Sequence, residues 1–299
     1  MNTILNDFGA FLDSLRKSRN MSREEFIEDI MSLRQYQRYV NGESSLNNDK
    51  LFRLIDRTGM NFLTVHRLYI IRNSEQQPIL NSIYKEIISD NYNSAKKLIK
   101  QISEDALNDE YAKSFFELCK LILHRRTNTM PSNLIVDKLK KLIGYPDCMK
   151  NEIISFVEYI AYLDISNHSL DSNDSLKIVN FLYKKIKEDN LVSDSSQILY
   201  LPSTYSHIAS KLGVFKEYEK ALVIAQKGID FCLRFDSLNS LALLFYYKAI
   251  SLQYLGKREE ALISAKKTFS ILFVENKENK TLNFIKSFEK NFNMKASEL

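Results

Sequence analysis

The sequence predicts an almost wholly α-helical protein, with a small helical head at the N-terminus and a long helical array after it. The chain of 299 residues holds only seven Gly and four Pro, so residues that interrupt helices are scarce. Apolar residues recur at intervals of three and four along most of the chain, as on one face of a helix, and long β-branched alternations are missing. The length suits more than one domain, or one helical domain followed by an array of repeats.

Neither the net charge nor the known catalytic motifs indicate a function for this sequence. The net charge of +5 is mild, and residues 1–72 carry eleven Lys and Arg against nine Asp and Glu, a difference of +2. Charge alone therefore does not indicate a nucleic-acid-binding protein. No catalytic motif or phosphate loop is present, so we expect no enzymatic activity, no catalytic residue and no cofactor.

The cysteines, the N-terminus and the apolar stretches predict the cellular compartment of the protein. Cys119, Cys148 and Cys232 are scattered, without a C-x-x-C pair or a histidine at ligand spacing, which predicts reduced thiols and no metal site. The N-terminus lacks a secretory signal, and no apolar stretch approaches the about 20 residues of a membrane span. We expect a cytoplasmic protein without a membrane partner.

Two helices open the head. The first has an apolar stripe of Ile4, Phe8, Phe11, Leu12 and Leu15 and ends in the basic stretch R-K-S-R-N. The second begins at Ser22 with the capping box Ser22-x-x-Glu25. Its apolar face consists of Phe26, Ile27 and Ile30, which leaves only Met31 and Ser32 before the next helix. This spacing predicts a helix-turn-helix.

The third helix lies in Ser32 to Glu43, where Ser32 and Gln35 form a second capping box and Asn41-Gly42 predicts a left-handed C-terminal stop. Tyr36, Tyr39 and Val40 form one apolar stripe, which turns Arg34, Gln35, Gln37 and Arg38 outward. Arg and Gln can bind base edges, although any amphipathic helix carries such residues on its exposed face.

Two further helices complete a five-helix unit. One covers residues 46–58, with Leu51, Leu54 and Ile55 inward, and the other covers 61–72, with Phe62, Val65, Leu68 and Tyr69 inward. The stretches L-R-K-S-R-N-M-S-R-E-E-F, R-x-Y-x-R-Y-x-N-G-E and L-F-R-L-I-D-R-T-G-M-N resemble the repressor-type (XRE) helix-turn-helix domain. The turn between Ser22 and Ser32 is one residue shorter than usual, as in the Rgg, PlcR and PrgX group of Gram-positive regulators.

The resemblance and the geometry of a recognition helix predict the DNA contacts. Such a helix enters the major groove with its N-terminus first, so Arg34, Gln35 and Arg38 are expected at base edges, with Gln37 as a fourth. Cations at helix ends and turns hold phosphates and set the register. We expect that role for Arg16, Lys17, Arg23 and Lys50, where Arg23 stands in a position that repressors usually fill with Gln. The alternative is a copy of the fold that no longer binds DNA.

The polar stretch N-S-E-Q-Q-P at 73–78 marks the boundary of the head. We expect a DNA-binding domain over 1–72, a linker over 73–78 and a repeat domain for peptide binding and dimerisation over 79–299. Helical patterns continue after the linker. They cover about 79–90, 93–104, 108–126, 132–143, 149–165, 171–188, 195–212, 215–234, 238–255, 257–274 and 278–292.

An internal repeat is visible near the C-terminus. Small and apolar residues in one pair of helices recur forty residues later in the next pair, as in a degenerate tetratricopeptide array. The set is Tyr205, Ala209, Leu212, Tyr218, Ala221, Ala225 and Gly228, matched by Phe245, Ala249, Leu252, Arg258, Ala261, Ala265 and Thr268. Stacked helix pairs wind into a superhelix whose concave side suits an extended peptide.

Polar and aromatic residues on the first helices of these pairs are the candidate peptide contacts, although packing roles are as compatible with them. They are Ser206, His207, Ser210, Asn239, Tyr246, Tyr247 and Gln253. The stretch D-S-L-N-S-L-A-L-L-F-Y-Y-K-A also resembles the late repeats of PlcR-type regulators.

Head and repeats together resemble the peptide-pheromone receptors of Gram-positive bacteria. The resemblance implies a cytoplasmic, homodimeric transcription regulator that binds a palindromic operator in double-stranded DNA. A short signalling peptide bound in the repeats controls it, as in quorum sensing. Two alternatives stay open: a Rap-like repeat protein that acts on a protein partner, and a repressor without a peptide ligand.

Overall fold

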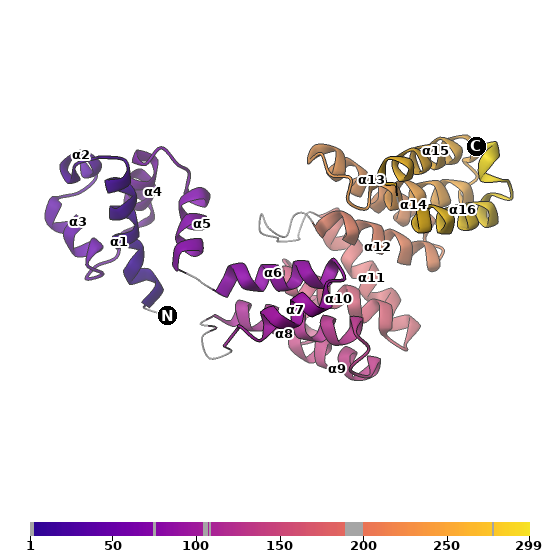
Figure 1. Ribbon diagram of the computed structural model, residues 1–299, viewed down its shortest axis with the longest axis horizontal. Helices are drawn as coiled ribbons and strands as arrows, with labels where there is room; N and C mark the ends of the chain where they lie inside the picture. The colour runs from indigo at the N-terminus through magenta and orange to yellow at the C-terminus, as the bar shows by residue number, and fades with distance from the viewer. Residues whose placement is uncertain (1–2, 74–75, 104–106, 108, 189–199, 277) are drawn as a thin grey trace. The chain divides into compact units, whose positions relative to one another are not determined.

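The computed structural model describes residues 3–73, 76–103, 107, 109–188, 200–276 and 278–299 (Figure 1). Over these residues it consists of α-helices and short 3₁₀ helices, with no β-strand, and this confirms the predicted fold class. The chain divides into two compact units: Met1–Glu86 with Ser94–Leu107, and Ile87–Asn93 with Asn108–Leu299.

The head, residues 3–73, contains the five predicted helices. Each begins and ends within a few residues of its predicted limits, as is usual for helix ends. The helices are α1 (Thr3–Ser18), α2 (Arg23–Ile27), α3 (Leu33–Val40), α4 (Asn48–Arg57) and α5 (Phe62–Asn73).

Two apolar clusters form the core of the head, and α3 contributes a tyrosine to each. Tyr39 packs with the α1 residues Phe8, Phe11 and Leu12 and with residues of α4 and α5, whereas Tyr36 packs with Phe26 of α2 and Leu54 of α4. Tyr36 is 0% exposed. The predicted inward stripe of α3 is therefore confirmed, and it holds this short helix against α1, α2 and α4.

Two residues of α5 lie outside the core, contrary to the predicted inward face. Val65 and Tyr69 are buried, but Phe62 is 36% exposed and Leu68 is 39% exposed. The reason is geometric: Val65 and Tyr69, at i and i+4, form the stripe of α5 that packs against the rest of the head. Phe62 lies beside this stripe, and its ring packs edge-on against Phe52 at 5.3 Å.

The second helix is shorter than its apolar pattern predicts. It ends at Ile27, because Glu28 leaves the helical region and Asp29 takes a positive φ of 56°. Arg57 of α4 stabilises this early end by donating from Nη1 to the Glu25 carbonyl, 2.5 Å away, and from Nη2 to the Glu28 carbonyl, 2.8 Å away. The turn before α3 is thus longer than the two residues expected.

The predicted linker coincides only in part with a helix boundary. Residues 76–78 already belong to α6 (Gln76–Ile88), which is followed by α7 (Tyr92–Ile99), while residues 74–75 lie outside the described residues. Most of α6 and α7 falls in the same compact unit as the head. The domain limits at 72 and 79 stay a prediction.

Nine further α-helices and two 3₁₀ helices are described after α7, and each helical pattern predicted there overlaps one of the α-helices, although the pattern expected from residue 149 becomes an α-helix only at Phe156. They are α8 (Glu110–Arg126), α9 (Ser132–Ile143), η2 (Asp147–Lys150), α10 (Phe156–His168), α11 (Ser172–Lys187), α12 (Leu201–Val214), α13 (Tyr218–Arg234), α14 (Leu241–Tyr254), α15 (Arg258–Glu275), α16 (Glu278–Phe292) and η4 (Ala296–Glu298). Residues 189–199, including the predicted start of α12, lie outside the described residues.

The internal repeat corresponds to two helix pairs, α12 with α13 and α14 with α15. Each of these helices packs on the next, and α12 also packs directly on α14 (Figure 1). Ala209, Ala225, Ala249 and Ala265 are all fully or almost fully buried. Small side chains at these positions let the helices approach closely, which is the physical basis of the repeat pattern.

Gly228 allows the closest of these approaches. A Cβ atom at this position would lie 2.6 Å from Cδ2 of Leu244 on α14 and 2.8 Å from Cβ of Tyr205 on α12. The equivalent position forty residues later holds Thr268, fully buried, whose hydroxyl donates to the Ser264 carbonyl at 3.2 Å. A glycine is therefore required where three helices meet, but not one repeat later.

Candidate nucleic-acid interface and ligand face

Both ends of α3 carry the predicted capping signals. The Ser32 side chain accepts from the Gln35 amide at 3.3 Å, and Gln35 Oε1 accepts from the Ser32 amide at 3.4 Å, so the capping box is confirmed. At the other end Gly42 has a φ of 74°. The amides of Gly42 and Glu43 donate to the carbonyls of Tyr39 and Arg38, at 3.0 and 2.8 Å, which is the Schellman arrangement.

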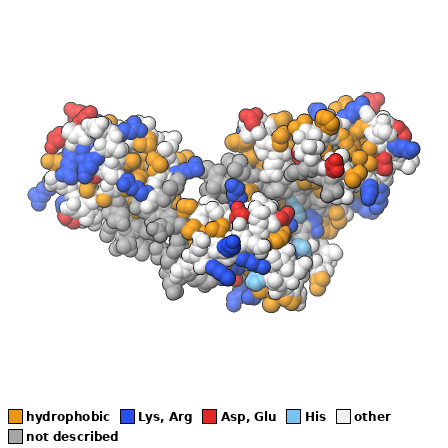
Figure 2. Space-filling model, in the orientation of Figure 1, with side chains coloured by type: hydrophobic (Ala, Val, Ile, Leu, Met, Phe, Trp, Pro, Cys, Tyr) orange, Lys and Arg blue, Asp and Glu red, His pale blue; other side chains and the backbone are white. Residues whose placement is uncertain are grey.

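The outward face of α3 is polar and exposed, as the stripe pattern predicts. Arg34, Gln35, Gln37 and Arg38 are all exposed. Lys and Arg side chains gather on the head over α3, and acidic side chains gather over α2 (Figure 2). Arg38 lies 3.8 Å from the Glu43 carboxylate, but both groups are more than half exposed, so this ion pair is weak and easily exchanged.

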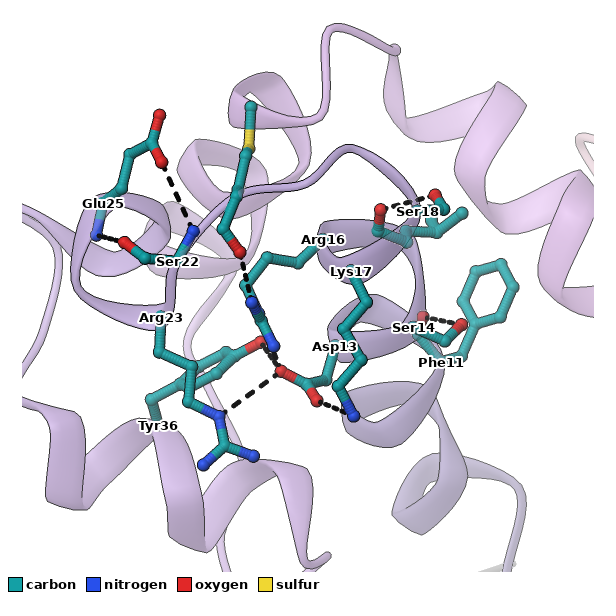
Figure 3. A network of polar contacts seen from close by, with 12 residues as sticks. Phe11, Asp13, Ser14, Arg16, Lys17, Ser18, Ser22, Arg23, Glu25 and Tyr36 are labelled. Carbon is teal, nitrogen blue, oxygen red and sulfur yellow. Dashed lines mark hydrogen bonds and ion pairs between the residues drawn. The ribbon is translucent and has the colours of Figure 1, made fainter.

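A buried carboxylate, that of Asp13 on α1, lies beside Tyr36 on the inner side of α3 (Figure 3). Its Oδ1 accepts from Arg16 Nε at 2.9 Å and from the Tyr36 hydroxyl at 3.0 Å, and its Oδ2 lies 3.0 Å from Lys17 Nζ. Arg23 Nε of α2 is 3.7 Å from Oδ1. One carboxylate thus contacts residues of α1, α2 and α3.

The charge of this carboxylate is stabilised by its partners. Burial raises the pKa of Asp13, but hydrogen bonds from Arg16, Lys17 and Tyr36 outweigh burial and lower that pKa to about 2. Asp13 is therefore ionised at neutral pH. Burial, together with the charge of Asp13, raises the pKa of Tyr36, so the phenol stays a donor and the Asp13–Tyr36 hydrogen bond persists over the physiological range.

The four predicted phosphate-binding cations occupy different environments. Arg16 is only 7% exposed, and its Nη1 donates to the Met21 carbonyl, so its guanidinium is committed to the interior. Lys17 and Arg23 keep 64% and 39% of their side chains exposed. Lys50 is half-buried, and its backbone amide donates to the Asn47 side chain at the start of α4. Lys17 and Arg23 are thus the cations that Asp13 gathers beside α3.

Two residues that organise this surface were not among the predicted site residues. Asp13 has Arg16 and Lys17 three and four positions later on α1, and this spacing is a recognisable ion-pair signal. Its contact with Tyr36 joins residues 23 positions apart, and the contacts of Arg57 with the end of α2 span about thirty positions. No local pattern encodes such contacts.

In the repeat region, the candidate peptide contacts of α12 lie on consecutive turns. The Ser206 hydroxyl is buried and donates to the Ser203 carbonyl at 2.7 Å, so its hydrogen bond is already made. Ser210 is half-buried. His207 is half-buried too, and its Nε2 is buried without a hydrogen-bond partner among the described residues.

The candidates on α14 have unequal access. Tyr246 is 7% exposed, and its hydroxyl contacts the Ser287 hydroxyl of α16, so its burial gives no support to ligand contact. Tyr247 is half-buried and packs edge-on against Tyr246 at 5.8 Å. Gln253 buries its Oε1 with no partner in the described part of the chain. Asn239 lies apart, exposed in the loop before α14.

The three cysteines are buried free thiols, as predicted. Burial raises the pKa of Cys119, and it raises the pKa of Cys232 to about 11, so these two thiols are protonated at neutral pH. Within the described ranges, no helix combines the length and apolar character that a membrane crossing requires.

Comparison with known proteins identifies the fold through solved structures alone, since no family model and no curated protein matches the sequence. PlcR of Bacillus thuringiensis, solved in complex with the peptide PapR7 and DNA, is similar with a TM-score of 0.69 at 15% identity. That match covers 93% of this chain and 99% of PlcR.

Two streptococcal structures give the same result. The SHP pheromone receptor Rgg2 (C45S) of Streptococcus dysgalactiae has a TM-score of 0.63 at 15% identity, over 95% of this chain and 99% of that one. ComR of S. thermophilus, in complex with DNA and its signalling peptide ComS, has a TM-score of 0.60 at 17% identity, over 93% and 97%. The chain thus shares, over nearly its whole length, the fold of peptide-responsive transcription regulators.

Proposed function

We propose that this chain is a cytoplasmic, sequence-specific transcription regulator that binds double-stranded DNA through α3 and is controlled by a short signalling peptide bound in the repeat region. The observation that carries the DNA-binding part is the geometry of α3. Its inner tyrosines are locked in the core, and its outer face presents Arg34, Gln35, Gln37 and Arg38. Arg pairs with guanine and Gln with adenine in the major groove.

The surrounding cations complete the proposed interface. Lys17, Arg23 and Lys50 would hold phosphates on either side of α3, and Arg16 would act from inside by fixing Asp13. Two copies of the chain, each presenting one α3, would read a palindromic operator as a homodimer. Peptide control is supported by the shared fold with PlcR and ComR, both solved with a peptide and DNA, and a peptide acts by favouring one arrangement of the dimer.

The test is selection of DNA by the full-length protein from a pool of random duplexes at fixed salt, followed by binding to the selected duplex and a scrambled one. We expect a palindromic consensus and clear preference for it. Selection without any consensus would contradict the DNA-binding proposal and favour a protein-binding repeat protein instead. Loss or gain of DNA affinity on adding short peptides encoded beside the gene tests peptide control, and a repressor without a ligand would show no such change.

A further inference from the structure

Two basic side chains one turn apart on α12, His207 and Lys211, have no hydrogen-bond or ion-pair partner among the described residues for the imidazole Nε2 and the ammonium. His207 Nε2 is buried without a hydrogen bond among the described residues. Lys211 is half-buried, and burial is the one influence on its charge that is resolved among these residues. A buried polar nitrogen without a partner and a partly desolvated ammonium without a counter-ion each cost free energy of folding. An added acceptor would stabilise the ammonium, and it would stabilise the imidazole in the tautomer that carries its proton on Nε2.

The carboxylate that acts on His207 is already paired with another cation. Asp164 on α10 is a carboxylate whose charge acts on His207, and Arg125 on α8 already holds it, from Nη2 at 2.5 Å and from Nε at 3.2 Å. Arg126, beside Arg125, adds a further cation that acts on His207. Among the described groups named here, the cations Arg125, Arg126 and Lys211 therefore outnumber the carboxylate Asp164.

The protonation of these groups agrees with an anion-binding role. Burial, with Lys211 beside it, lowers the pKa of His207 to about 4, and burial lowers the pKa of Lys211. His168 of α10 joins the same group, and burial lowers its pKa as well. Burial thus disfavours the charged forms of all three groups, and a bound anion would offset that effect.

A carboxylate fits these donors better than a neutral group does. It accepts several charge-assisted hydrogen bonds at once, so it can take one from an imidazole N–H and one from an ammonium.

We propose that the His207–Lys211 face of α12 binds a carboxylate of the peptide ligand, either its C-terminal carboxylate or an Asp or Glu side chain. The proposal rests on the peptide-binding function proposed above: it takes peptide binding as given and specifies the charge of the group that is bound. It makes His207 and Lys211 specificity determinants that select an anionic peptide group against its neutral amide.

Affinity selection on the full-length protein tests this with four pools of randomised heptapeptides. The pools combine a free or an amidated C-terminus with the presence or absence of Asp and Glu, and retained peptides are quantified by mass spectrometry. We expect carboxylate-containing peptides to be enriched over the amidated pool without Asp and Glu by about tenfold to a hundredfold, as for a charge-assisted pair. The pool that carries the enrichment distinguishes the C-terminal from the side-chain carboxylate.

Three variants connect that enrichment to the proposed residues. Lys211→Met and His207→Phe should reduce the preference toward one while neutral peptides stay bound to the same extent. Lys266→Met removes the same charge from an exposed position on α15 and should keep the preference. An unchanged preference in Lys211→Met and His207→Phe, with thermal unfolding like that of the Lys266 variant, would overturn the assignment.

The pools also separate this proposal from the function on which it rests. Peptides retained without regard to charge would overturn the carboxylate site alone, and peptide binding would stand. No retained peptide from any pool would overturn both.

Discussion

The Tyr36 hydroxyl on α3 donates a hydrogen bond to Asp13 Oδ1 on α1, 3.0 Å away, and both side chains are buried. This contact crosses from the proposed reading helix to the first helix of the head. Because the same carboxylate also contacts Lys17 and Arg23, the position of α3 and the positions of two proposed phosphate contacts depend on one residue. Asp13 is therefore the structural centre of the proposed interface.

Removing the Tyr36 hydroxyl should make local opening of α3 more frequent without unfolding the protein. Tyr36→Phe keeps the packed ring but deletes a hydrogen bond to a charged acceptor, a loss of about 2 kcal/mol. Amide hydrogens of residues 33–43 should exchange roughly thirty times faster, as that free energy implies for local opening. Hydrogen exchange of the full-length protein measures this, with α14 as the internal control. Equal exchange in both proteins would mean that packing alone fixes α3.

Neutralising Asp13 should separate DNA affinity from DNA specificity. Asp13→Asn raises the charge of the head by one and frees Lys17 and Arg23, so non-specific affinity should rise and depend more steeply on salt. The preference for the selected duplex over a scrambled one should fall by about tenfold, because α3 loses its anchor. Fluorescence anisotropy at several salt concentrations measures both quantities.

A matched variant controls for charge in that experiment. Asp56→Asn makes the same change of charge at an exposed position on α4, so it should raise non-specific affinity while the preference between the two duplexes is retained. If the two variants behave alike, Asp13 contributes only its charge and not the position of α3.

Direct base contacts by α3 predict sequence-dependent losses. Arg34→Ala and Arg38→Ala should each weaken binding to the selected duplex by about 1–3 kcal/mol and relax preference at one base pair. Arg67→Ala removes the same charge from an exposed position on α5 and should weaken both duplexes equally. Unchanged affinity of the Arg34/Arg38 double variant at fixed salt would exclude base contact by this helix.

Two glycines should respond oppositely to the same substitution. Gly228→Ala places a methyl group 2.6 Å from the Leu244 side chain and 2.8 Å from Tyr205 Cβ, which should destabilise the repeat region by about 1–3 kcal/mol. Gly213→Ala on α12 meets no atom within 4 Å and should stabilise by up to about 1 kcal/mol through helix propensity. Thermal unfolding compares them, and a stable Gly228→Ala protein would mean that α12, α13 and α14 do not pack as closely as described.

Acid should destabilise the region around α12. The pKa of His207 is about 4 in the folded protein and about 6.5 in an unfolded chain, so the unfolded state binds more protons between these values. The contribution of His207 to the free energy of unfolding is complete above pH 6.5 and is lost as the pH falls toward 4. His207→Gln should flatten this dependence, measured by hydrogen exchange of α12 against pH.

The neighbouring charges set how far that dependence can flatten. Lys211 on α12 and Arg126 on α8 lower the pKa of His207, and Asp164 on α10 raises it. His168 on α10 titrates in the same group with a lowered pKa, so some acid sensitivity should remain in the variant. A pH dependence identical to that of the unsubstituted protein would place the effect entirely on other groups.

The features that the sequence alone determined are those written within a few consecutive residues. The capping boxes at Ser22 and Ser32 and the left-handed stop at Gly42 are all present in the structure, because each consists of contacts between residues three to five positions apart. The stripe of Tyr36 and Tyr39 and the alanines of the repeat follow helical periodicity, which also acts locally. The all-α fold class follows from the same signals.

Tertiary structure decided which of the indicated side chains are available for contact. In the sequence Arg16 resembles any cation at a helix end, but in the structure it is buried beside Asp13. Tyr246 is also buried, and its hydroxyl contacts Ser287 of α16. The early end of α2 depends on Arg57, which lies about thirty positions away along the chain. These outcomes depend on which helices meet, and the partners in such meetings are too distant in sequence for any local pattern to specify them.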